Sequence, residues 1–160
     1  MYIPYSELSD NNKIWVYVSE RPFTEEEDRF IDDKLTTLCN NWDVHGSPLK
    51  ASFVVVKSQI IVLLSDEVDN QASGCSIDSS VRAMKEIGEK LNVDFFNRWN
   101  VACEKDNTIQ VLHINDFKAK LKSGDMTGED YIFKNILSSK SEFESTFREK
   151  IIDSTYKMFL

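Results

Sequence analysis

The chain has 160 residues and a formal net charge of −8, from 27 acidic and 19 basic side chains. This length is typical of one domain whose core needs neither disulfides nor metals. The acidic balance disfavours nucleic-acid partners, because a negative surface repels phosphate backbones.

The location of the protein follows from what the sequence lacks. No apolar run approaches the roughly 18 residues of a membrane span, so no membrane partner is predicted. The start of the chain has no basic segment followed by an apolar one. Three cysteines without paired spacing do not form a disulfide framework. We therefore expect a cytoplasmic protein with reduced thiols.

The first part of the chain predicts a strand, a helix and a hairpin. Residues 13–19 are β-branched and aromatic, which favours a strand. Thr24 and Glu27 have the spacing of a capping box, and apolar residues then recur at helical spacing. Residues 49–66 are rich in valine and isoleucine and divide at Lys57–Ser58, which favours a hairpin over one long helix.

The second part predicts another helix, a second hairpin and a helical tail. An apolar stripe over residues 77–91 predicts a helix that begins near Cys75. Residues 100–114 predict a hairpin that turns at Asp106–Asn107. The residues from Asn115 onward predict helical pieces.

The predicted order is β-α-β-β-α-β-β followed by helices, an α+β fold. Its first six elements match the ferredoxin-like plan, in which one antiparallel sheet has two helices on one face. Residues 1–160 would form one domain, with an α/β sandwich core over residues 1–113. Residues 114–160 would be a helical C-terminal elaboration. This elaboration would cover the other face of the sheet or pair two subunits in a homodimer.

The segment NQASGCSIDSSVR, residues 70–82, places a glycine and a cysteine where a loop gives way to a helix. Ser73, Ser76 and Asp78 are residue types that cap the free amides of a first helical turn, so a purely structural role is one interpretation. A helix N-terminus also attracts anions and activates a cysteine, so an anion site or a nucleophile is the other.

A cysteine nucleophile needs a base. His45, in the turn WDVHGSP, is a better candidate partner for Cys75 than His113 at the end of the last predicted strand. Acidic residues near Cys75 oppose formation of its thiolate.

An anion site has support from Asn70 and from Arg98, which follows the same helix; Arg82 would point away from the helix N-terminus. No nucleoside-triphosphate loop is present, because no lysine follows Gly74 in the required register. The three cysteines lie far apart and the acidic residues after the first hairpin lack calcium-loop spacing, so no metal or other cofactor is predicted.

Four segments resemble a family of short bacterial proteins of unknown function, many of which carry the automatic label "ABC transporter ATPase". The segments are MYIP (residues 1–4), NWDVHGSPLKASF (41–53), NQASGCSIDSSVR (70–82) and DFFNR (94–98). The resemblance implies a soluble single-domain unit and contributes no catalytic residues. The label requires a Walker A loop and a signature motif, and the sequence contains neither.

These observations favour a binding or regulatory module that recognises a small anionic ligand or a protein partner at the 70–78 loop and helix N-terminus. The alternative is a small cysteine-dependent enzyme, with Cys75 as nucleophile and His45 as base. The predicted site gathers ligand-binding residues around that pair: Asn70, Ser73, Ser76, Asp78 and Arg98.

Overall fold

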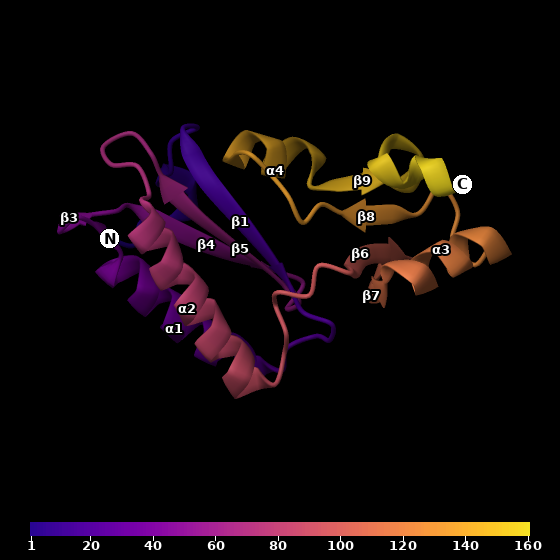
Figure 1. Cartoon of the computed structure of the whole chain (residues 1–160), viewed down its shortest axis with the longest axis horizontal. Helices are drawn as coiled ribbons and strands as arrows, with labels where there is room; N and C mark the ends of the chain where they lie inside the picture. Colours follow the sequence, from indigo (N-terminus) through magenta and orange to yellow (C-terminus); the bar gives the residue numbers. More distant parts are fainter.

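The computed structural model describes residues 1–160 and has the α+β architecture shown in Figure 1. The helices are α1 (Glu25–Asn41), α2 (Gly74–Leu91), α3 (Ile114–Ser123) and α4 (Lys140–Thr146). The strands are β1 (Asn12–Val18), β2 (Asp43–Val44), β3 (Ser47–Pro48), β4 (Ala51–Val56), β5 (Ile60–Asp66), β6 (Asn100–Lys105), β7 (Thr108–His113), β8 (Tyr131–Phe133) and β9 (Arg148–Lys150). Short 3-10 helices cover Tyr5–Glu7, Ile151–Asp153 and Thr155–Phe159.

The first sheet contains β1, β5 and β4 in that order, and both strand pairs are antiparallel. These are the strand and the hairpin predicted from the sequence. The hairpin turns at Lys57 and Ser58, whose φ angles of 49° and 50° suit a tight turn. Helices α1 and α2 lie together on one face of this sheet (Figure 1).

Helix α1 begins with the predicted capping box. The side chain of Thr24 accepts a hydrogen bond from the Glu27 amide at 3.2 Å, and Glu27 Oε1 accepts one from the Thr24 amide at 3.3 Å. Both bonds satisfy amides that have no partner within the helix, so the box fixes where α1 starts.

The strand over Asn100–Lys105 does not join the first sheet, so the ferredoxin-like arrangement is not confirmed. Strand β6 pairs with β7 on one side and β8 on the other, and β9 completes a second sheet of order β7-β6-β8-β9. A small third ribbon joins β2 to β3. The residue pattern of a strand indicates that it is extended, whereas its neighbours are set by residues distant in the sequence.

The first sheet is covered on both of its faces. Ile61 and Leu63 enter a core shared with α1 and α2, while Ile60 and Val62 enter a second core that includes Phe133 of the other sheet. Every residue of β5 is buried as a result. The second sheet packs its far face against α3 in a third core.

The prediction that residues 114–160 are a helical elaboration is wrong in part, because β8 and β9 lie within them. The spacing of Phe143, Phe147 and Ile151 is helical, which explains the error. Phe147 belongs to the core between the two sheets, however, and Ile151 to the core beneath α3. One helical face cannot reach both cores, and the chain extends as β9 between them.

A buried carboxylate ties the two sheets together. Glu104 of β6 has a side chain that is 2% exposed, and its Oε2 accepts a hydrogen bond from Lys57 Nζ at 2.6 Å. Its Oε1 accepts one from Arg148 Nε at 3.0 Å, and the Arg148 guanidinium lies 3.5 Å over the ring of Tyr131. Burial works against the charged form of Glu104, but the hydrogen bonds and charges of Arg148 and Lys57 outweigh it and lower the pKa.

Replacing Glu104 by Gln is expected to lower the free energy of unfolding at pH 7 by about 2 kcal/mol, because the hydrogen bonds from Lys57 and Arg148 lose their charged acceptor. The folded pKa of Glu104 is lowered, so its stabilisation is complete above the unfolded pKa and is lost as the pH falls through the folded pKa. The difference between wild type and variant should therefore shrink below about pH 4. Urea denaturation of both proteins at pH 7 and at pH 3 measures this difference in the free energy of unfolding.

Glu129→Gln is the matched control, because the side chains of Glu129 and Lys150 are 72% and 40% exposed in their ion pair. Its effect should stay within about 0.5 kcal/mol. A Glu104→Gln variant as stable as wild type at pH 7, or equally weakened at both pH values, would contradict this account of the buried carboxylate.

Candidate functional site

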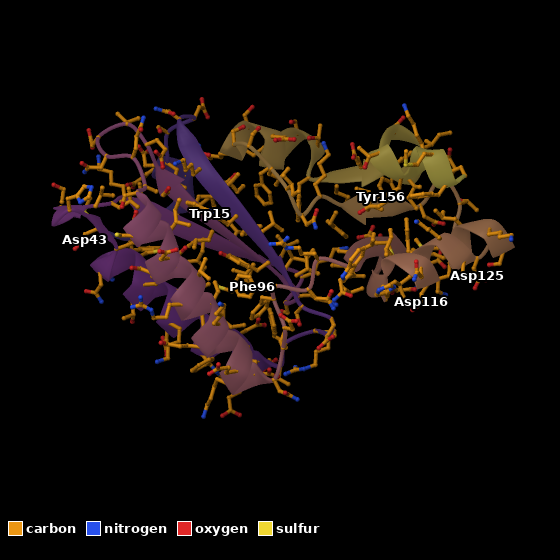
Figure 2. All side chains as sticks on the ribbon, in the orientation of Figure 1. Trp15, Asp43, Phe96, Asp116, Asp125 and Tyr156 are labelled. Carbon is orange, nitrogen blue, oxygen red and sulfur yellow. The ribbon has the colours of Figure 1, made fainter.

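A groove of about 780 Å³ runs between α1 and α2 on the side of the helices away from the sheet core. Its volume lies within the range of small-molecule sites. Apolar side chains contributed by both helices form part of its wall, and polar side chains surround them. The apolar members are Phe30, Leu38, Trp42, Ala83 and Ile87, and the charged members are Lys34, Asp43, Glu86 and Lys90. Asp43 marks the end of the groove where α1 stops (Figure 2).

The predicted loop-to-helix motif lies at that same end. Ser73 is the N-cap of α2, and its Oγ accepts a hydrogen bond from the Ser76 amide at 3.2 Å. In return the Ser73 amide donates to Ser76 Oγ at 2.6 Å, so serine takes the place that glutamate usually holds in a capping box. The structural interpretation of these serines is therefore confirmed.

Trp42 fastens the start of α2 to the end of α1. Its indole Nε1 donates a hydrogen bond to the buried carbonyl of Ser76 at 2.7 Å. The Trp42 ring also packs against that of Trp15 on β1, with 5.7 Å between centroids. The two helices and the sheet thus hold this end of the groove in a fixed geometry.

His45 and Cys75 both line the groove, and both are exposed. His45 is held at the tip of the β2–β3 ribbon, where its φ of 53° and the 82° of Gly46 form a tight turn. The hydrogen bonds of the structure include none between His45 and the Cys75 thiol. The geometry required of a prepared nucleophile and base is thus absent from this conformation.

Cys75 differs from the other two cysteines. Cys39 and Cys103 are buried, and burial raises the pKa of each thiol to about 12. Cys75 is exposed at the second position of α2. Any thiol chemistry of the folded protein belongs to this residue.

Three of the predicted residues lie outside the groove. The Asn70 side-chain amide donates to the Pro48 carbonyl at 3.1 Å and holds the loop against β3. Asp78 is exposed and does not line the groove. Arg98 follows the far end of α2, about 27 Å along an 18-residue helix, and lines a different hollow. The prediction that Arg98 joins Cys75 and His45 in one site is wrong, since α2 separates them.

The acidic residues after β5 have local partners. Asp66 accepts hydrogen bonds from the amides of Ser9 and Val68, and Asp69 pairs with Lys50 at 2.8 Å. No group of three or more metal-ligating side chains occurs in the structure.

Lys34 and Lys90 also line the groove and were not predicted from the sequence; Lys90 is in the last turn of α2, the helix end away from Cys75. Neither lysine forms an ion pair in the structure, whereas eight other pairs are formed. A signal was available, because Phe30, Lys34 and Leu38 recur every four residues beside the buried stripe of α1.

Comparisons with protein-family models, with curated proteins and with solved structures found no match to this chain. No helix combines the length and the apolar character needed to cross a membrane. The function is therefore inferred from the residues of the chain itself.

Replacing Ser73 by Ala should lower the free energy of unfolding by about 1 kcal/mol, because the Ser76 amide loses its N-cap acceptor. Ser79→Ala is the control: the Ser79 hydroxyl only bonds back to the Cys75 carbonyl in the same helix, and its loss should cost less than about 0.5 kcal/mol. Thermal or urea unfolding of both variants checks this. Equal effects would argue that capping does not hold the start of α2.

Proposed function

We propose that the protein is a non-enzymatic binding module for a small anionic ligand that lies in the groove between α1 and α2. The observation that carries the proposal is the pairing of a partly apolar groove with unsatisfied amide donors beside its Asp43 end. The capping box uses the amide of Ser76, but the amides of Cys75, which lines the groove, and of Gly74, the residue before it, have no acceptor in the structure. Free amides in a first helical turn suit an anion.

The wall of the groove supports a ligand with an apolar body. Phe30, Leu38, Trp42 and Ile87 would lie against that body, and a concave apolar surface of this kind binds by removing ligand surface from water. Lys34 on α1 and Lys90 in the last turn of α2 would attract a second negative charge, because neither is neutralised by an ion pair. The ligand best matched to these features is an elongated amphipathic anion.

A direct test uses 1-anilinonaphthalene-8-sulfonate, an apolar sulfonate whose fluorescence rises on binding. We expect saturable binding at one site per chain. Gly74→Pro removes one free amide, and proline is well tolerated at the first helical position after an extended residue such as Ser73. Affinity should fall by roughly tenfold, the loss expected for one hydrogen bond to a charged group.

Gly74→Ala keeps the amide and is the matched control, because a Cβ at Gly74 meets no atom within 4 Å. Its affinity should stay within about twofold of wild type. Ala83→Phe should abolish binding by filling the middle of the groove. Fluorescence that is unchanged by both Gly74→Pro and Ala83→Phe would place the probe elsewhere and count against the proposal.

A second candidate function is a cysteine-dependent enzyme, with Cys75 as nucleophile and His45 as base. The observation that favours it is that Cys75, the exposed thiol, lines the same groove as His45. A closed form of the β2–β3 turn would be required to bring imidazole and thiol into hydrogen-bond contact.

Alkylation by iodoacetamide at pH 7 separates the two functions. If the protein is a binding module, Cys75 alone should react in the folded protein, at the rate of a free thiol such as glutathione. An activated nucleophile would react about tenfold faster, because an ordinary thiol is only a few per cent ionised at this pH. In that case His45→Ala should return the rate to the glutathione value. Mass spectrometry of the labelled peptides over time provides the measurement.

A further inference from the structure

The outer edge of β1 presents backbone groups that no other strand pairs. The register of β1 with β5 is continued by Ser19 N to Gln59 O and by Glu67 N to Asn11 O, both hydrogen-bonded. Since bonded residues alternate in an antiparallel pair, the odd-numbered residues of β1 bond to β5. The N–H and C=O groups of Ile14, Val16 and Val18 therefore point away from β5, and β1 has no second partner strand.

The other edge of the same sheet, along β4, is covered by another segment of the chain. The N-terminal segment runs along β4, where the Ala51 amide donates to Met1 O and the Ile3 amide donates to Ala51 O, at 3.0 and 2.9 Å. The strand that a ferredoxin-like sheet would place beside β1 is β6, and β6 lies in the second sheet. The edge of β1 is consequently left without a partner strand beyond Asn12, whose side chain accepts a hydrogen bond from the Lys140 amide of α4 at 2.8 Å. An open edge is a template for another strand.

A hollow of about 190 Å³ lies along this edge. Val16 and Val18 of β1 line it, and so do Phe96 and Arg98 of the connection between α2 and β6. Asn100 and Asn135 also line it, and their side chains form no hydrogen bond within the protein. The space beside the unpaired backbone is therefore lined by both apolar and polar side chains.

The charge and the exposure around the hollow indicate what it accepts. Arg98 is exposed and forms no ion pair. Trp99 and Ile136, the residues that follow Arg98 and Asn135, are 65% and 82% exposed. Tryptophan and arginine are the residue types that most often anchor protein interfaces.

We propose that the free edge of β1 binds an extended peptide segment of a partner protein, which adds a strand beside Ile14, Val16 and Val18 and carries a carboxylate to Arg98. This is the β-augmentation mode, in which main-chain hydrogen bonds supply affinity and side-chain contacts supply specificity. A second copy of β1 fits less well. Antiparallel pairing about Val16 would bring Lys13 rather than a carboxylate to the Val18 end, next to Arg98.

The open edge itself is tested by amide hydrogen exchange in the free protein. The amides of Ile14, Val16 and Val18 should exchange at least about tenfold faster than those of Trp15 and Tyr17, which bond to β5. Uniform protection along β1, together with a dimer in light scattering, would mean that a second copy covers the edge and would overturn the proposal.

The partner chemistry is tested by selecting phage-displayed random dodecapeptides on the full chain. Selected peptides should alternate β-branched or aromatic residues and contain an aspartate or glutamate. Arg98→Glu should weaken their binding by roughly tenfold, equivalent to about 1.4 kcal/mol, while Arg82→Glu, the same change on the exposed surface of α2, should leave it within twofold.

Val16→Pro provides an independent variant, because it removes an edge N–H that β5 does not use, and proline is tolerated on edge strands. It should weaken the same peptides, and in a bound complex the amides of Ile14 and Val18 should become protected. A selection that yields no peptide sensitive to Arg98→Glu, or peptides that bind without protecting these amides, would overturn the proposal.

Discussion

The complete burial of β5 is the constraint on which the rest of the structure depends. A central strand with apolar side chains on both faces needs a cover for each face, and one pair of helices supplies only one. The second sheet supplies the other, through Ala102 and Phe133. The chain after α2 therefore forms a separate layer that covers the second face of β5, and it does not add a fourth strand beside β1.

Both candidate interaction surfaces follow from this arrangement. Because α1 and α2 pack their most apolar faces onto the sheet, Phe30 and Leu38 on the flank of α1 remain half-buried and line the groove. Because β6 leaves for the second sheet, β1 keeps an open edge and the α2–β6 connection passes beside it. The groove and the hollow have no lining residue in common, and Cys75 of the groove and Arg98 of the hollow lie at opposite ends of α2.

Elements defined by local signals were predictable from the sequence. The capping box at Thr24, the turn at Lys57–Ser58 and the serine cap at Ser73 act within a few residues and mark the ends of α1, β4, β5 and α2. The partner of β6 and the short strands β8 and β9 depend on contacts between distant residues, so no local pattern reveals them. The residues of the candidate site show the same difference between local signals and distant contacts. His45, Ser73, Cys75 and Ser76 come together because turns and caps place them, whereas Arg98 was assigned to them without regard for the length of the helix between.

The structural and functional interpretations of the 70–78 loop are compatible, because they use different atoms. The serine hydroxyls and the Ser76 amide are committed to the cap, and a ligand that competed for them would unravel the start of α2. The amides of Gly74 and Cys75 take no part in the cap, and the absence of a side chain at Gly74 leaves the approach to them open. An anion bound there would complete the hydrogen bonding of the first turn. Ligand binding and helix capping would then stabilise the same end of α2, and the bound ligand would raise the stability of the fold through that helix.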